Sequence, residues 1–152
     1  MTISEFCELH SAYRKDREWV LANCRTMKEV WDTIRPSCLV WVATRPGVLT
    51  DKELRLFAVH CARSVQHLME DARSRHAVDV AERYAHGDAT DEELAAASAV
   101  ASATAWAAQA AVASATAEDA ATVAAWNTAW DAVRAAQAEY LRANTTPNFG
   151  DL

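Results

Sequence analysis

Glycine and proline are scarce in this chain, with 3 of each among its 152 residues. Both residue types interrupt helices, so long stretches of the sequence contain no helix breaker. Valine, isoleucine and threonine never alternate with polar residues over a useful length, which argues against half-buried strands. Alanine, the strongest helix former, fills 34 positions. These features predict an all-α fold in a chain of single-domain size.

The sequence motifs of phosphate, metal and nucleophile chemistry are also missing. There is no P-loop and no Gly-x-Ser-x-Gly, and so few glycines argue strongly against a phosphate-binding loop. His60 and His67 lie two helical turns apart, without further ligands at metal-binding spacing. No Cys-x-x-Cys pair occurs among the four cysteines, which are Cys7, Cys24, Cys38 and Cys61. We therefore expect no catalytic centre, no cofactor and no metal site, and we expect reduced, buried thiols.

Basic residues are absent between Arg83 and Arg134. Residues 1–83 carry 13 basic and 12 acidic side chains, whereas residues 84–152 carry 2 and 9, so the net charges are +1 and −7. The C-terminal half therefore lacks the broad basic surface that binds nucleic acid, and we expect no direct nucleic-acid partner. Its acidic surface permits docking on a basic partner, although an acidic surface that contacts only solvent is commoner.

Residues 95–121 form an alanine-rich stretch without Lys, Arg or Gly. It is long enough for a membrane span, but Gln109 and the missing basic flanks argue against one. A helix that is apolar on nearly all sides is normally surrounded by other helices, so we expect a central helix. Glu5 and Glu8 lie where a secretory signal would be apolar, so we expect a cytoplasmic protein without a membrane anchor.

Helix starts are predicted by three Thr-x-x-Glu sequences, at Thr26, Thr50 and Thr90. In this capping box the threonine hydroxyl accepts a backbone N–H and the glutamate reaches back to the cap. The helices are expected over about 4–23 (with or without a break), from about 27 onward, and over about 38–43, 50–69, 72–86, 91–114 and 118–143. Apolar residues recur at helical spacing along the last of these, at Val123, Trp126, Trp130 and Val133.

The expected architecture is a single-domain bundle of about six to seven helices. The alanine-rich helix lies at its centre, and a turn near residues 114–118 makes the last two helices an antiparallel hairpin. We place the domain at residues 1–144 and expect residues 145–152 to form a frayed tail.

A candidate partner surface follows from the charge distribution. It combines the acidic residues of the C-terminal half with two small basic clusters. The candidates are Asp88, Asp91, Glu92, Glu118, Asp119, Arg14, Arg17, Arg73 and Arg75. The basic clusters have acids within or beside them, so solvated helix faces with i,i+4 partners are the simpler interpretation.

The order of several segments resembles a known family. The segments read REWVLANCRTMKEVWDTIRPSCLVWV, LTDKELRLFAVHCARSVQHL and AERYAHGDATDEELAAASAVASATAWAAQAA, at 17–42, 49–68 and 81–111. They are similar to the bacterial and phage-borne sequences named immunity proteins, which are all-α with alanine-rich C-terminal halves. The resemblance covers roughly residues 17–111. It implies binding and neutralising a toxin, and it brings no catalytic residues with it.

Two functions remain open. The first is a non-catalytic inhibitor that neutralises a toxin or a bacterial defence enzyme by direct contact, as an immunity protein or a phage-encoded anti-defence protein such as an anti-CRISPR would. The second is a helical protein that binds or sequesters a nucleotide-type small molecule in a pocket lined by Trp and Arg. A close-packed alanine face would also permit a homodimer.

Overall fold

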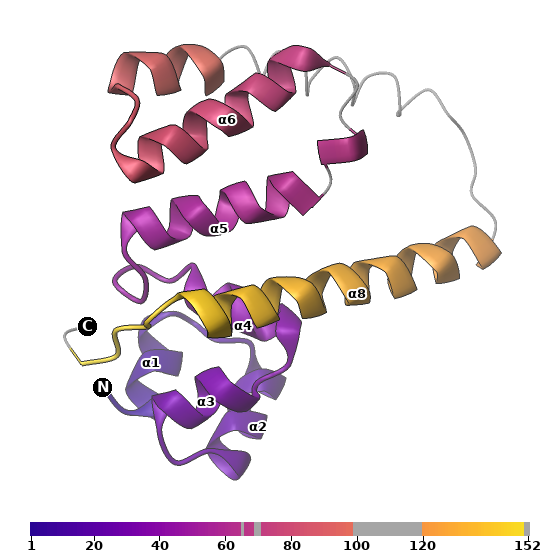
Figure 1. The fold of residues 1–152 in the computed structure, drawn as a ribbon. Coiled ribbons are helices and arrows are strands. Elements are labelled where there is room, and N and C mark those ends of the chain that lie inside the picture. Colours follow the sequence, from indigo (N-terminus) through magenta and orange to yellow (C-terminus); the bar gives the residue numbers. More distant parts are fainter. Residues whose placement is uncertain (65, 69–70, 99–119, 151–152) are drawn as a thin grey trace. The chain divides into compact units, whose positions relative to one another are not determined.

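The computed structural model describes residues 1–64, 66–68, 71–98 and 120–150 of the chain. Every regular element in these ranges is a helix, so the predicted all-α fold is confirmed (Figure 1). The described ranges contain slightly more helical segments than the six to seven expected. The chain divides into two compact units. One comprises residues 1–54 and 127–152, and the other comprises residues 55–126.

The N-terminal unit begins with four short helices, α1 to α4. They span Ile3–Leu9, Arg14–Asn23, Met27–Thr33 and Pro36–Ala43. The first predicted helix is therefore broken into two, and Ser11 in the break has a positive φ of 52°. Thr2 and Glu5 form a full capping box at the start of α1. Pro36 occupies the first turn of α4, where its missing N–H costs no hydrogen bond.

The three predicted helix starts are all present. At Thr50 and Thr90 the boxes are complete, because the backbone N–H of each threonine donates to the glutamate three residues on. At Thr26 the hydroxyl accepts the N–H of Glu29, but the Glu29 carboxylate accepts from Arg25 instead of Thr26. The Thr-x-x-Glu pattern thus predicted all three helix starts correctly. At Thr26 alone, the backbone N–H that donates to the glutamate belongs to the preceding residue, Arg25.

From Asn127 on, helix α8 (Ala120–Asn144) and the segment after it complete the N-terminal unit. Leu141 is fully buried. Arg142 donates from Nε to the Trp31 carbonyl at 3.0 Å and from Nη2 to the Ile34 carbonyl at 2.7 Å. These carbonyls lie at the C-terminal end of α3, where no intrahelical donor reaches them.

Residues 145–150, which belong to the expected C-terminal tail, form hydrogen bonds with distant parts of the chain. The Asn148 N–H donates to the Val48 carbonyl at 2.8 Å, and the Thr146 N–H donates to Glu53 at 2.9 Å. The Phe149 carbonyl accepts from the Met1 amino group at 3.1 Å. The Phe149 ring packs edge-on against Phe6 and Trp31. An aromatic anchor and backbone hydrogen bonds fix this segment, and neither is visible from its local composition.

The second unit holds α5 (Asp51–Ser64) from Arg55 on, a short 3-10 helix over Gln66–Leu68, and α6 (Ala72–His86). The expected helix over 50–69 is therefore shorter. Arg63 on α5 forms ion pairs with Asp79 and Glu82 on α6. Gly87 ends α6 in the left-handed conformation, with φ of 89°, which agrees with the expected helix end at residue 86.

Residues 91–98 are helical, which agrees with the start of the predicted alanine-rich helix. Ala97 in this segment is buried. The rest of that helix and the turn predicted near residues 114–118 lie outside the described residues. The side chains of Val123, Trp126 and Trp130 lie outside them as well, so the central helix, the hairpin and the domain boundary stay predictions.

Candidate functional site

The predicted partner-surface residues fall into both units. Arg14 and Arg17 lie on α2 of the N-terminal unit. Five others belong to the second unit, at the two ends of α6: Arg73, Arg75, Asp88, Asp91 and Glu92. Glu118 and Asp119 lie outside the described residues. That these side chains form one surface therefore stays a prediction.

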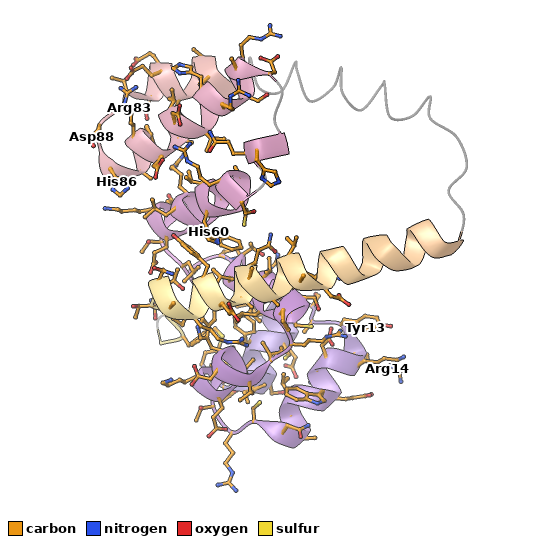
Figure 2. The ribbon with its side chains drawn as sticks, turned by 45° about the vertical axis from the view of Figure 1, so that its right-hand side comes forward. Tyr13, Arg14, His60, Arg83, His86 and Asp88 are labelled. Atoms are coloured by element: carbon orange, nitrogen blue, oxygen red, sulfur yellow. The ribbon has the colours of Figure 1, made fainter. Side chains whose placement is uncertain are left out.

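The acidic residues after α6 are engaged in local hydrogen bonds. Arg83 donates to the Asp88 carbonyl at 2.9 Å and forms an ion pair with Glu93 at 3.3 Å, and Figure 2 shows Arg83 and Asp88 together at this turn. The Tyr84 hydroxyl donates to Asp91. Glu92 is exposed. Contacts of this kind hold the connection between α6 and residues 91–98, so part of the predicted surface has a structural role.

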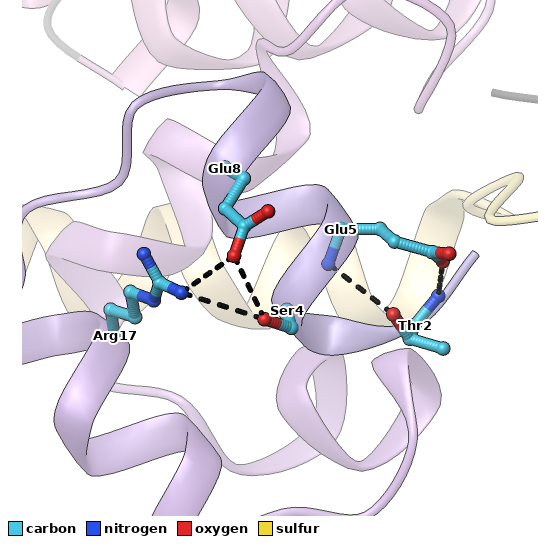
Figure 3. Close-up of polar contacts among 5 residues, drawn as sticks. All are labelled: Thr2, Ser4, Glu5, Glu8 and Arg17. Atoms are coloured by element: carbon cyan, nitrogen blue, oxygen red, sulfur yellow. Dashed lines mark hydrogen bonds and ion pairs between the residues drawn. The ribbon is translucent and has the colours of Figure 1, made fainter.

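Two of the predicted arginines also have partners within the chain. Arg73 binds Asp71, the N-cap residue of α6, through Nε and Nη2. Arg17 binds Glu8 at 2.8 Å and Ser4 at 3.5 Å, which joins α2 to α1 (Figure 3). Arg75 is half-buried. Arg14 is exposed and forms a long i,i+4 ion pair with Glu18, at 3.9 Å.

The side of α2 that faces α3 carries a groove of about 400 Å³. We call it the α2–α3 groove, and its walls are Tyr13, Lys15, Asp16, Trp19, Thr33, Ile34 and Arg35. Tyr13 is 66% exposed and Trp19 is 44% exposed. Figure 2 shows Tyr13 and Arg14 at the start of α2, with Arg14 projecting from the ribbon. Large aromatic side chains left exposed beside a groove are typical of interaction sites.

The sequence analysis did not select Tyr13 or Trp19. The available signal was the spacing of Lys15 and Trp19, because residues at i and i+4 share one helix face. Val20 is the buried residue of this helix, one position after Trp19. Trp19 therefore lies on the polar side, where a partner can reach it.

A cavity of about 270 Å³ lies next to the groove, among α1, α2, α3 and α4. We call it the N-terminal cavity. Cys7 and Cys38 line it, together with apolar side chains. The Arg35 Nε–H donates to the Cys38 sulfur at 2.9 Å, and this bond, with Asp16 close by, raises the pKa of Arg35. Burial raises the pKa of the Cys7 thiol, despite the positive charge of Arg17.

All four cysteines are free thiols, and Cys7, Cys24 and Cys38 are buried. In the described ranges, no group of three or more His, Cys, Asp or Glu side chains is placed to hold a metal ion. A search of the same residues finds no helix with the length and hydropathy needed to cross a membrane.

His10 follows α1 and has a buried Nε2 atom for which no hydrogen-bond partner is found in the described structure. Its ring lies 4.5 Å from the Phe6 ring, centroid to centroid. Burial lowers the pKa of His10 below its ordinary value of 6.5, and the positive charge of Arg45 lowers it further. The folded protein therefore holds this imidazole neutral at pH values where the unfolded chain protonates it.

We expect acid to destabilise the protein through His10. As the pH falls below about 6.5, the unfolded chain binds a proton that the folded protein refuses, so the free energy of unfolding decreases until the lower folded-state pKa is reached. Urea unfolding at pH 7.5 and pH 5.5 measures the loss, which His10→Leu should reduce. Replacing the exposed His76 by leucine is the matched control and should leave the loss intact. An equal loss in His10→Leu would contradict the assignment.

Comparison of this chain with protein-family models, with curated proteins and with solved structures gives no match.

Proposed function

We propose that the protein is a non-catalytic binding protein that holds a protein partner in the α2–α3 groove. The exposure of Tyr13 and Trp19 beside this groove is the observation that supports it. Burying large aromatic side chains against a partner releases substantial apolar surface from water, and such residues dominate the energetics of protein interfaces.

The charges of the groove favour an acidic partner surface. Lys15 and Arg35 supply two cations, while Asp16 is the one acid among its walls and is bound by Arg35 at 2.6 Å. Arg14 adds a third exposed cation at the start of the same helix. Complementary charges at the edge of an interface raise the association rate and reject partners of the wrong sign. The proposed partner therefore presents carboxylates around an apolar centre.

The class of partner comes from the resemblance described above. Under this proposal the protein acts as an immunity-type inhibitor, and the partner is a toxin or a bacterial defence enzyme. Neutralisation requires binding alone, because a bound inhibitor can cover an active surface without any chemistry of its own. The groove lies within the part of the chain that carries the resemblance, apart from Tyr13, Lys15 and Asp16.

Paired substitutions in the groove test the proposal. The protein and its Tyr13→Ser/Trp19→Ser variant are co-expressed with the toxin or defence enzyme encoded nearest to its gene, and the affinity of each purified pair is measured by calorimetry. We expect the double substitution to weaken binding by about 30-fold or more, as the loss of an interface hot spot does. Growth of cells that produce the toxin should then no longer be restored.

Leu21→Ser is the matched control, because Leu21 is exposed on the same helix but does not line the groove. It should bind with nearly full affinity. Unchanged binding by the double variant would contradict the location. Light scattering on the protein alone measures its molar mass, and we expect a monomer. A dimer that Trp19→Ser converts to a monomer would mean that a second copy occupies the groove, which would contradict the proposed partner.

A further inference from the structure

The N-terminal cavity has apolar, buried inner walls. Phe6, Val20, Met27, Val30 and Val42 contribute to them, and each of these side chains is at most 5% exposed. Water is held poorly in such a space, because a buried water needs two to four polar partners. An apolar cavity of about 150 Å³ is large enough to bind benzene. The cavity here measures about 270 Å³. If the number of carbon atoms scales with cavity volume from the benzene case, an apolar body of about eight to ten carbon atoms fits it.

The opening of the cavity carries charge. The lining residues that reach solvent include Tyr13, Arg17, Arg35 and Trp41. Asp16 is the one acidic side chain of the lining and pairs with Arg35, while Glu8, outside the lining, pairs with Arg17. An apolar space with cations at its entrance favours a ligand with an apolar body and one anionic group. A nucleotide is a poor fit, because its ribose and phosphates would face apolar walls.

Both arginines are held in place and keep donors to spare. Arg17 contacts Glu8 and Ser4 through Nη2 alone, as Figure 3 shows. Arg35 uses Nε for Cys38 and Nη2 for Asp16. A guanidinium group has five N–H donors, so each arginine can donate to a further anion without releasing its present partners. Carboxylates accept such charge-assisted bonds in fixed geometry.

We propose that the N-terminal cavity binds a small monocarboxylate with an apolar body of about eight to ten carbon atoms, of the medium-chain fatty acid class, with its carboxylate at Arg17 and Arg35. The apolar body fills the space lined by Phe6 and Val42, where it gains dispersion contacts that an empty cavity lacks. The ligand proposed for this cavity is a small molecule, whereas the α2–α3 groove is proposed to bind a protein. The cavity proposal does not depend on the proposed function.

Octanoate is the probe for the test, and octanol is the neutral comparison of equal chain length. Calorimetry on the full-length protein should give saturable binding of octanoate at one site, about 10-fold or more tighter than octanol. The methyl resonances of Val20, Val30 and Val42 should shift on binding. Those of Val48, which is buried but does not line the cavity, should not.

Two sets of variants separate the charge from the space. Arg17→Gln/Arg35→Gln should abolish the preference for octanoate and keep the binding of octanol, while Arg25→Gln, an exposed arginine outside the lining, should change neither. Ala12→Phe places a ring in the lining and should block both ligands, whereas Ala22→Phe on the exposed side of α2 should not. Thermal unfolding confirms that each variant folds.

The proposal is overturned by any of three results. The first is that octanoate binds without saturation, and the second is that octanol binds to the unsubstituted protein as tightly as octanoate. The third is that Ala12→Phe, shown to be folded, binds octanoate with full affinity. The binding tests use the protein without a partner, because four residues line both the cavity and the α2–α3 groove: Tyr13, Asp16, Ile34 and Arg35.

Discussion

Replacing Phe6 by alanine should lower the free energy of unfolding by about 3–5 kcal/mol. The Phe6 side chain is 2% exposed and lies where the start and the end of the chain meet. Its ring packs edge-on against Trp41 at 6.3 Å and Phe149 at 6.2 Å, centroid to centroid. Alanine would remove these aromatic contacts and enlarge the adjoining N-terminal cavity, and both effects are unfavourable.

Urea unfolding followed by circular dichroism measures this change, and Leu9→Ala provides the matched control. Leu9 belongs to the same short helix but is 62% exposed, so its replacement should cost no more than about 0.5 kcal/mol. If Phe6→Ala proved as mild as Leu9→Ala, the described packing of Phe149 on the first helix would be wrong.

Arg142→Ala should lower the free energy of unfolding by about 1.5–3 kcal/mol. The guanidinium group donates to the carbonyls of Trp31 and Ile34 at the end of α3. Its removal would leave two acceptors without their charged donor in a part-buried position, and an unsatisfied carbonyl there loses its hydration without compensation. The effect should be large for a polar residue because the arginine joins α8 to a helix more than one hundred positions away.

Arg134→Ala is the matched control on the same helix. Arg134 is partly exposed and pairs with Asp131 at 3.7 Å, so its loss should cost between zero and about 1 kcal/mol. Arg142→Lys should lie between the two, since lysine keeps the charge but cannot present the planar fork to both carbonyls. An Arg142→Ala variant as stable as Arg134→Ala would contradict the assigned hydrogen bonds.

The sequence predicted those features of the fold that depend on nearby residues. The capping boxes at Thr50 and Thr90 need a threonine and a glutamate three positions apart, and both formed as expected. Fixation of the C-terminal segment could not be predicted in this way. It depends on Phe149 meeting Phe6, a residue 143 positions earlier, and no local pattern encodes that contact.

The candidate site was predictable only in part. Arg17 and Arg35 are ordinary polar residues of a helical sequence, and they gain a role from the cavity that four separate helices enclose. Trp19 was not among the predicted site residues, and its exposure depends on the direction in which α2 runs after the break at Ser11. A positive φ at a serine is a conformation that sequence patterns seldom reveal.

The N-terminal unit is discontinuous in sequence, since it draws on residues 1–54 and 127–152. On the ribosome, the first segment emerges long before the helix that carries Leu141 and Arg142. At about 5–20 residues per second, the delay is on the order of 5–20 s. During that interval the apolar surface around Phe6 has no C-terminal segment to cover it. The unit therefore completes its fold only after residues 127–152 have been made, and a chain cut short before residue 127 would expose that surface to chaperones and proteases.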